Sequence, residues 1–240
     1  MIDSLRRHLR TQHFNPSFIG VFVNPFFLAR RQLWVEMAGL APMASGRLLD
    51  VGCGSKPYRA LFDVAQYVGL DIDSPNSRQR GVADIFYDGT RFPFDDGRFE
   101  SVLCNQVLEH VFNPDEFVAE ICRVLTPGGR LILTVPFVWD EHEQPHDYAR
   151  YSTFGLRSLL ERNGFRVLEQ HKLLADCSVL FQLTNAYLYK VLHSRHRSVN
   201  LLVTAGLLAP ISVLGWVLGR LLPDNPDLFL DQAVVAEKKP

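Results

Sequence analysis

A short apolar strand that runs directly into a glycine turn places the strongest constraint on the fold of this chain. The stretch RLLDVGCGSKPY, residues 47–58, has the pattern of a buried strand followed by Gly52 and Gly54. Glycines at this spacing let the backbone approach a ligand closely, and we expect the turn to aim its N–H groups outward. A G-x-G pair is weak evidence by itself, but it makes a nucleotide-like cofactor the first hypothesis.

The rest of the chain alternates short apolar runs with segments of helical length, which is typical of a parallel sheet covered by helices. The segments PDEFVAEICRVL and TFGLRSLLERN carry apolar residues at helical spacing, and each ends before a glycine or proline stop signal. The predicted strands are residues 47–51, 67–71, 101–105, 130–135, 165–170 and 230–238.

Composition narrows the class of protein. The 240 residues are 47% hydrophobic, enough for one domain with a sizeable core. The formal net charge of -1 gives no case for a nucleic-acid partner, so we expect a small-molecule partner. Four scattered cysteines without C-x-x-C spacing fit a reducing cytoplasm.

The basic segment 5–10 precedes an apolar run that Asn24-Pro25 interrupts, so we interpret it as mature sequence rather than a signal peptide.

Asp71 and a missing third glycine distinguish between two classes of cofactor. Asp71 lies about twenty residues beyond the glycine turn at the end of a strand, where a carboxylate can bind both ribose hydroxyls. A dinucleotide also needs a third glycine near its pyrophosphate, but Lys56-Pro57 stand there, and we expect Lys56 to point to solvent. S-adenosylmethionine has no phosphate, and an anionic Asp50 beside the turn suits its amino group. The residues therefore favour S-adenosylmethionine.

Four motifs in the same order resemble those of the class I S-adenosylmethionine-dependent methyltransferases, in the branch called methyltransferase type 11. They are LLDVGCG, VGLDID, YDGTRFPFDDGRFESVLCNQVLEHV and EICRVLTPGGRLILTVP, within residues 47–170. The resemblance implies an α/β fold with a Rossmann-like, seven-stranded, mostly parallel sheet, helices on both faces and an antiparallel last strand. It also implies S-adenosylmethionine as the cofactor and S-adenosylhomocysteine as its product.

The same resemblance assigns the cofactor-binding residues. Asp71 would bind the ribose, and Ile72 would cover one face of the adenine. Asp88 would bind the adenine amino group, with Gly89 offering its backbone. Asn105 would lie under the sulfonium and methionine segment. The residues that would face the methionine part come from the first strand and its turn: Asp50, Gly52, Cys53 and Gly54.

A segment dense in aromatic and titratable residues, WDEHEQPHDYARYST, follows the strand that ends at Val135. Methyl transfer is an in-line displacement, so an enzyme must align the acceptor and remove a proton from a hydroxyl or a protonated amine. Histidine suits this role because its ordinary pKa lies near neutrality. The candidate catalytic residues are His142, His146, Asp147 and Tyr148, with Tyr151 beside them.

Three other interpretations of these residues stay open. His142 and His146 are four positions apart, as helical metal ligands are, but Pro145 opposes a regular helix, so we expect no metal. Glu109-His110 could be a catalytic pair, but the family resemblance implies that such a pair orders the loop after its strand. A purely structural alternative pins the loop to the sheet through Asp147, Arg150 and Tyr151.

An apolar insertion precedes the last strand. Residues 198–219 carry no charge and follow the basic segment KVLHSRHR. Their length suits a membrane-spanning helix, but a single crossing would leave the last strand on the wrong side of the bilayer. Gly206, Pro210 and Gly215 also break the run, and Pro210 would kink a helix. We expect a helical pair that forms a substrate lid, a contact with an anionic membrane surface, extra core or a dimer interface.

We therefore expect one methyltransferase domain over residues 1–240. The predicted function is methyl transfer to a small, lipid-linked or glycan-linked acceptor, with oxygen as the acceptor atom. The alternatives are carbon methylation of a prenylated quinone-like substrate and an inactive cofactor-binding scaffold. The expected location is cytoplasmic, at the inner face of the membrane if residues 198–219 contact lipid. The four expected parts are a helical extension or lid (1–46), the cofactor-binding core (47–171), the apolar insertion (172–223) and the final strand (224–240).

Overall fold

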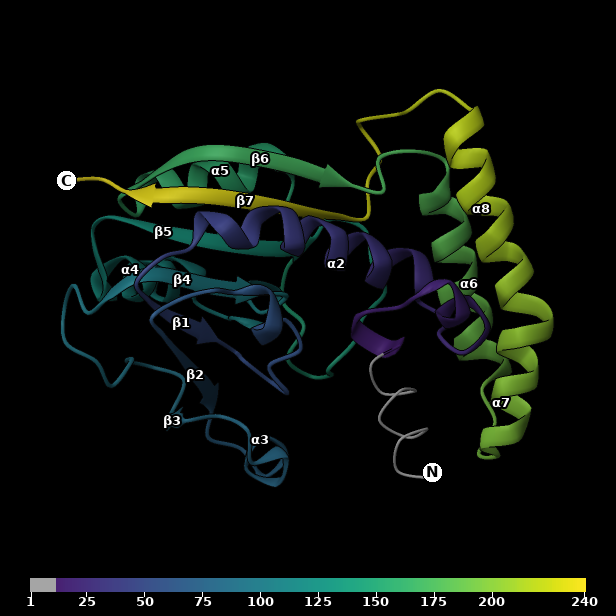
Figure 1. The fold of residues 1–240 in the computed structure, drawn as a ribbon, viewed down its shortest axis with the longest axis horizontal. Coiled ribbons are helices and arrows are strands. Elements are labelled where there is room, and N and C mark those ends of the chain that lie inside the picture. The colour runs from purple at the N-terminus through teal and green to yellow at the C-terminus, as the bar shows by residue number, and fades with distance from the viewer. Residues whose placement is uncertain (1–11) are drawn as a thin grey trace. The chain divides into compact units, whose positions relative to one another are not determined.

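The computed structural model describes residues 12–240, and the chain divides into two compact units (Figure 1). The first, called the sheet unit, comprises Met37–Phe137, Glu141–His171 and Gln232–Pro240. The second, called the helical unit, comprises the described residues up to Glu36, together with Val138–Asp140 and Lys172–Asp231. The basic segment 5–10 lies outside the described residues.

The sheet unit is built on seven strands in the order β3-β2-β1-β4-β5-β7-β6. Strand β1 pairs in parallel with both β2 and β4, and the pairs β2–β3 and β4–β5 are also parallel. Strands β7 and β6 run in opposite directions (Figure 1). The predicted Rossmann-like, mostly parallel sheet is confirmed. The strands are β1 (Arg47–Val51), β2 (Gln66–Ile72), β3 (Ile85–Tyr87), β4 (Phe99–Asn105), β5 (Leu125–Pro136), β6 (Phe165–Leu173) and β7 (Asp231–Lys238).

Two details of the sheet differ from the sequence-based prediction. The sequence does not predict β3, because three residues are too few to show an alternating pattern. Strand β5 begins at Leu125 rather than Arg130, so Pro127-Gly128-Gly129 lie within the strand and do not form the end of the helix. The preceding helix ends at Val124.

The two longer helices that lie wholly in the sheet unit, α4 and α5, each bury one apolar stripe. Helix α4 (Pro114–Val124) buries Phe117, Val118, Ile121 and Val124, and its first turn carries acidic residues that suit the positive helix end. Helix α5 (Thr153–Arg162) begins where the Ser152 side chain accepts a hydrogen bond from the Gly155 N–H. Its three buried leucines each stabilise the fold by roughly 2 kcal/mol. The remaining short elements are η2 (Ala41–Met43), η3 (Arg59–Leu61), α3 (Pro75–Arg80) and η4 (Leu108–His110).

The helical unit is built mainly on α6 and one long helix that packs against it. The long helix runs without a break from Arg197 to Leu221, so the expected interruption at Pro210 is wrong. A π-helical turn that ends at Leu208, two residues before the proline, accommodates its ring and its missing N–H. The elements are η1 (Phe18–Phe22), the start of α2 (Phe27–Leu40), α6 (Ser178–Leu192), α7 (Arg197–Val203), the π segment η5 (Thr204–Leu208) and α8 (Ala209–Leu221).

Candidate functional site

The predicted cofactor residues gather at one edge of the sheet. Strands β1 to β4 are mutually parallel neighbours, so their carboxyl ends lie at the same edge. Strands β2 and β4 flank β1 on opposite sides, and open α/β sheets bind ligands at such a switch point. The residues at this edge are Asp50, Gly52, Cys53 and Gly54 from β1 and its turn, Asp71 and Ile72 from β2, Asp88 and Gly89 after β3, and Asn105 from β4.

The turn after β1 requires glycine at its first position. Gly52 has a φ of +67°, and a Cβ at this residue would lie 2.4 Å from Val107 Cγ2. Gly54 has a φ of +51° with open space where its side chain would be, because the nearest atom is 4.0 Å away. The N–H groups of Gly52 and Cys53 donate to the Leu70 carbonyl at 2.9 and 3.1 Å. The expectation that the turn aims its N–H groups outward is therefore wrong for these two.

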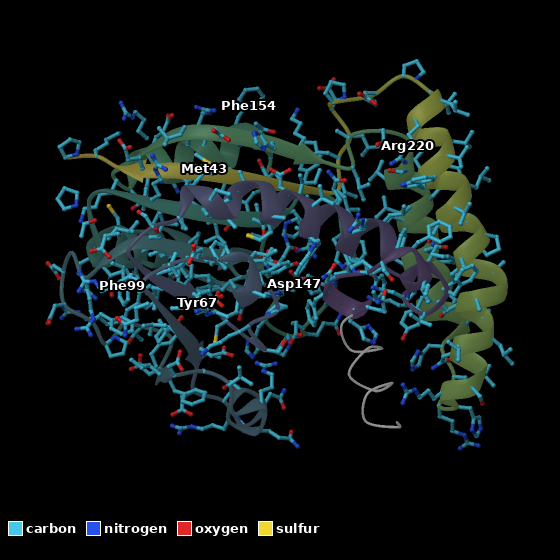
Figure 2. The ribbon with its side chains drawn as sticks, in the orientation of Figure 1. Met43, Tyr67, Phe99, Asp147, Phe154 and Arg220 are labelled. Atoms are coloured by element: carbon cyan, nitrogen blue, oxygen red, sulfur yellow. The ribbon has the colours of Figure 1, made fainter. Side chains whose placement is uncertain are left out.

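Asp50 is a buried carboxyl group beside the glycine turn. The Tyr67 hydroxyl donates to Asp50 Oδ2 at 2.6 Å, and Tyr67 is labelled in Figure 2. Burial raises the pKa of Asp50 to about 7, although the Tyr67 hydrogen bond and the charge of Lys56 act in the opposite direction. Such a group gains its negative charge readily when a cation approaches. Asp50 therefore fits a cofactor that carries an ammonium group and a sulfonium.

Lys56 does not point to solvent as expected. Its Nζ lies 2.6 Å from Asp84 Oδ2, and the same oxygen accepts the Gly69 N–H at 2.7 Å. The Lys56 side chain packs so closely on Gly69 that a Cβ there would lie 2.3 Å from Lys56 Cε. Lys56 thus ties the glycine turn to the residues that precede β3. The reason is electrostatic, since Asp84 offers a partner that is distant in sequence.

Asp71 and Ile72 end β2 at this edge in different environments. The carboxylate of Asp71 is buried, with Oδ1 accepting the Ile72 N–H at 2.9 Å and Oδ2 3.4 Å from Arg80 Nη2. The Ile72 side chain is exposed, and its Cδ1 would lie 3.3 Å from a Cβ at Gly89. The Ile72 side chain thus offers an apolar surface, called the ledge, beside Gly89, which has no side chain of its own. A planar ring such as adenine fits this arrangement.

The side chains of Asp88 and Asn105 are held by local hydrogen bonds. Asp88 Oδ1 accepts from the Thr90 N–H at 2.9 Å and from the Thr90 hydroxyl at 2.6 Å. The Thr90 hydroxyl holds the pKa of Asp88 below its ordinary value, so this side chain is an acceptor. Asn105 Oδ1 accepts from the Thr134 hydroxyl at 2.8 Å. That bond fixes the orientation of the Asn105 amide.

Cys53 is a buried thiol, and burial raises its pKa to about 12. The thiolate is therefore suppressed at neutral pH, which excludes a nucleophilic role. Its sulfur would lie 2.8 Å from a Cβ at Gly69, so Cys53 fills the space between the turn and β2.

A second group of titratable residues follows β4 and β5, which are neighbours in the sheet. Residues 109–110 in η4 follow β4, and residues 141–151 follow β5. Glu109, His110 and His142 each offer a ligand atom within 4.8 Å of the others, so they could also hold a metal ion. The rings of His110 and His142 meet edge to face with centroids 4.8 Å apart. The sequence pairs His142 with His146, but the structure pairs it with His110.

His110 has a defined tautomer in this group. Its Nδ1 lies 2.7 Å from the His146 carbonyl oxygen, which can only accept, so Nδ1 carries the proton. Burial lowers the pKa of His110, which favours the neutral ring. Its Nε2 faces Glu109 Oε1 at 3.8 Å. The position of Glu109 and His110 directly after β4, at the carboxyl edge of the sheet, is the signal that the sequence offers for this cluster.

Asp147 orients His142 and is itself held by Arg150. The guanidinium donates to Asp147 Oδ1 at 2.6 Å and to Oδ2 at 2.7 Å, and it holds the pKa of Asp147 well below its usual range. Asp147 Oδ2 accepts the His142 N–H at 3.0 Å and lies 3.4 Å from His142 Nδ1. Figure 2 labels Asp147. The ionised Asp147 therefore connects Arg150 with the backbone of His142 inside this loop.

His146 and Tyr148 form a separate pair. His146 Nδ1 lies 3.0 Å from the Tyr148 hydroxyl, and the Tyr148 ring meets Phe112 edge to face. The Tyr148 N–H donates to the Glu109 carbonyl at 2.8 Å, which anchors the loop beside η4. Tyr151 is held by its backbone, since its carbonyl accepts from Gln232 Nε2 at 2.6 Å. Burial raises the pKa of Tyr151 to about 12, so Tyr151 is not a base near neutrality.

Among known protein families, the one described as Methyltransferase domain matches residues 49–133. This segment holds the glycine turn, β2, β3, β4 and most of β5. The chain is also similar to a fatty-acid O-methyltransferase of Mycolicibacterium smegmatis, with 35% identity over 115 residues that cover 43% of this chain and 42% of that protein. A demethylmenaquinone methyltransferase of Clavibacter sepedonicus is 32% identical over 114 residues, covering 42% of this chain and 46% of that protein.

The chain spans less than half the length of these curated relatives. Among solved structures, a phosphoethanolamine N-methyltransferase 2 of Haemonchus contortus in complex with S-adenosyl-L-methionine has a TM-score of 0.57 at 16% identity, covering 94% of this chain and 58% of that one. The [4+2]-cyclase SpnF has a TM-score of 0.55 at 22% identity, covering 88% and 81%. These structures share the fold of this chain.

Proposed function

Because the chain carries a methyltransferase domain of the class I, type 11 family, we propose that it transfers a methyl group from S-adenosylmethionine to a hydroxyl oxygen of a small, lipid-linked or glycan-linked acceptor. The observation that carries this proposal is the pairing of His142 with an ionised Asp147 at the sheet edge that also holds the glycine turn. The residues that follow β1 and β2 at this edge suit the cofactor, and His142, which follows β5, offers a base.

The cofactor, when bound, supplies an electrophilic methyl group. Asp50 would attract its ammonium group, since the buried carboxyl can ionise near neutral pH. Asp71 would accept hydrogen bonds from the ribose hydroxyls, and the ledge of Ile72 and Gly89 would hold the adenine. Asp88 would accept from the adenine amino group, and Asn105 would lie beneath the methionine part. Gly54 leaves the open space that the turn needs on this side.

His142 would act as the general base for the acceptor hydroxyl. With Nδ1 directed at Asp147 Oδ2, the remaining Nε2 can take a proton from a hydroxyl as the oxygen attacks. The carboxylate of Asp147 then stabilises the imidazolium that forms. His110 is kept neutral by burial, so it adds no positive charge beside His142. His146 and Tyr148 would line the acceptor side rather than transfer the proton.

The relatives support two classes of acceptor atom. Similarity to a fatty-acid O-methyltransferase favours oxygen on a lipid-like acceptor. Similarity to a demethylmenaquinone methyltransferase favours the second candidate, carbon methylation of a prenylated quinone-like substrate. A base such as His142 serves oxygen more directly, because a hydroxyl must lose its proton as the new bond forms. The third hypothesis, an inactive scaffold, predicts cofactor binding without turnover.

The test is methylation of a cell extract and its lipid fraction by the purified protein with labelled S-adenosylmethionine, followed by mass spectrometry of the labelled product. We expect one labelled compound whose label sits on oxygen. The His142→Asn variant should bind the cofactor normally and lose label transfer. His171→Asn, which changes an exposed histidine of β6, is the matched control and should keep full transfer. Cofactor binding without any labelled product would favour the scaffold, and a label on carbon would favour the quinone-like substrate.

A further inference from the structure

The two main helices of the helical unit pack with small and polar side chains between them. Thr204, Ser212 and Gly215 of the long helix are buried, and a Cβ at Gly215 would lie 2.6 Å from Phe181 Cβ of α6. Asn185 of α6 donates from Nδ2 to the Leu208 carbonyl at 3.1 Å and to the Ser212 hydroxyl at 2.8 Å. Thr204 donates to the Asn200 carbonyl of its own helix at 2.8 Å. These donors of the interface are thus paired internally.

The opposite face of the long helix is apolar and exposed. The helix has 25 residues. One stretch of 18 of them has a mean hydropathy of 2.2, and 28% of that stretch is buried. Leu202 and Leu221 are each 72% exposed, and the residues from Ser198 to Gly219 carry no charge. Exposed apolar surface of this extent marks an interaction site in a soluble protein. Other exposed apolar side chains of this helix include Leu201, Leu207 and Leu214.

This distribution is the reverse of that in a water-soluble helix pair, where large apolar side chains lie inside and polar ones outside. Helices that pack in lipid instead place small residues and paired polar groups at their interface, because lipid is as apolar as leucine. A second copy of this chain would cover the face as well. However, a second copy would not explain why small and polar side chains lie between α6 and the long helix. Such contacts bury little apolar volume, and they suit a helix pair with an apolar surrounding.

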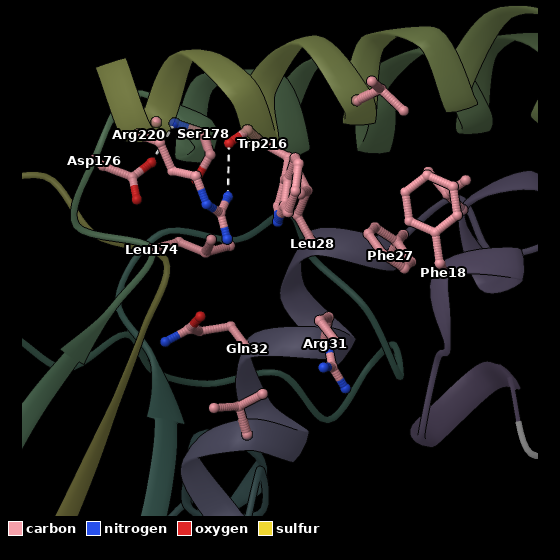
Figure 3. A pocket seen from close by; sticks show the side chains of 14 residues that line it. Phe18, Phe27, Leu28, Arg31, Gln32, Leu174, Asp176, Ser178, Trp216 and Arg220 are labelled. Atoms are coloured by element: carbon pink, nitrogen blue, oxygen red, sulfur yellow. Dashed lines mark hydrogen bonds between the residues drawn. The ribbon is translucent and has the colours of Figure 1, made fainter. Parts of the chain in front are cut away.

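Element η1 adds exposed apolar side chains beside the long helix. It contacts both η5 and α8, and it exposes Phe18 by 67% and Ile19 by 61%. A pocket of about 510 Å³ lies between η1, α2 and α8, with Phe18, Phe27 and Trp216 on its walls (Figure 3). Arg31 and Arg220 also line it, and the Arg220 guanidinium lies over the Trp216 ring at 3.8 Å. The pocket therefore combines apolar walls with cationic groups.

Basic residues at the ends of the long helix favour a helix that lies in the membrane surface. Arg195 lies just before α7, Arg197 is the first residue of α7, and Arg220 is near the end of α8. At about 37 Å the helix is long enough to cross a bilayer. Its neighbour α6 has 15 residues, about 22 Å, and its Lys190 is paired with Asp140 at 2.7 Å. Crossing would carry the charged connection between the helices through hydrocarbon, which is costly.

We propose that the helical unit docks on an anionic lipid bilayer, with the outer face of Arg197–Leu221 and η1 in the interfacial layer. The apolar side chains would enter the acyl boundary, and Arg195, Arg197 and Arg220 would meet anionic headgroups. The expectation of a location at the inner face of the membrane rests on the same segment and forms part of this proposal, since that leaflet is anionic. Docking does not depend on the proposed reaction, because it needs neither cofactor nor turnover.

The test is co-sedimentation of the whole protein with phosphatidylcholine vesicles, with and without phosphatidylglycerol. We expect binding that increases with the anionic lipid and loses that increase at high salt. The double variant Leu202→Glu, Leu221→Glu should bind at least about tenfold more weakly. Phe154→Glu is the matched control, since Phe154 of α5 is 82% exposed in the sheet unit (Figure 2), and it should bind as the unchanged protein does.

Circular dichroism checks that each variant is folded, and analytical ultracentrifugation without lipid reports self-association. Absence of vesicle binding overturns the proposal, and a stable dimer that the double variant separates would identify a second copy as the occupant instead. Equal loss of binding in Phe154→Glu also contradicts it. Alkaline carbonate extraction of cell membranes should release the protein, because a surface helix is not integral. Retention would show that the helix spans the bilayer.

Discussion

Asp147 Oδ2 lies 3.4 Å from His142 Nδ1 while the same carboxylate accepts two hydrogen bonds from the Arg150 guanidinium. The guanidinium keeps Asp147 ionised, and the backbone N–H of His142 adds a third bond at 3.0 Å. The imidazole thus lies beside a carboxylate that stays ionised, which is the arrangement that the proposed base requires.

Asp147→Asn should lower kcat by at least about tenfold while S-adenosylmethionine binding stays unchanged. Steady-state kinetics measures kcat, and calorimetry with S-adenosylhomocysteine measures binding. A purely structural role would reduce thermal stability and activity together, and thermal unfolding of the same variant separates the two roles.

Cofactor binding should strengthen as pH rises towards 7. The pKa of Asp50 is raised to about 7, so at lower pH the carboxyl is protonated and does not attract the ammonium group. If bound cofactor requires the ionised form, affinity should rise by about tenfold per pH unit below the pKa and then level off. Isothermal calorimetry with S-adenosylhomocysteine measures this slope. Asp50→Asn should bind more weakly and show no slope in this range.

Asp50 should also influence stability in the absence of ligand. Since its folded-state pKa exceeds the ordinary value of 3.8, the folded protein holds a proton that the unfolded chain releases. The resulting contribution to the free energy of unfolding is fully present below pH 3.8 and is lost as pH rises through about 7. Denaturant titrations from pH 5 to 8 measure it, and Asp50→Asn should reduce the decline. An unchanged decline in that variant would assign the effect to other groups.

Gly52→Ala should destabilise the sheet unit and abolish cofactor binding. The new methyl group would lie 2.4 Å from Val107 Cγ2 in a left-handed conformation, so we expect a loss of roughly 3 kcal/mol in the free energy of unfolding. Gly54→Ala is the matched control, because it adds the same atom into open space and has only the strain of a positive φ, about 1 kcal/mol. Chemical denaturation compares the two. Equal losses would show that contact with Val107 is unimportant.

Removal of metal ions should leave methyl transfer unchanged. Glu109, His110 and His142 have the proximity that an ion needs, but the proposed base must keep the His142 nitrogen available for a proton. Activity after dialysis against a chelator, with and without added Zn²⁺ or Mg²⁺, measures the difference. Loss of activity that an added ion restores would contradict the proposed role of His142. It would assign these three residues to a metal centre.

Local patterns predict most of the sheet unit. The alternation of strands and helices, the glycine turn and Asp71 are readable because each depends on neighbours within a few residues or on a spacing that the fold imposes. The parallel order of β1, β2 and β4 then brings Asp50, Asp71 and Asn105 to one edge. Local patterns thus predicted a parallel sheet covered by helices, whereas the seven strands and the antiparallel last strand were implied by the family resemblance, and β3 is too short to produce a pattern.

Contacts between residues far apart in the sequence decided the features that local patterns did not predict. Lys56 has the appearance of a surface residue until Asp84 is placed beside it, and His142 acquires His110 as a neighbour only when β4 and β5 lie side by side. Pro210 suggests a helix break, yet a π turn absorbs it within a packed pair. In each case a long-range partner or packing force outweighs the local preference. Local sequence therefore determines which elements form, whereas the burial, charge and orientation of the side chains between them emerge only from the packed chain.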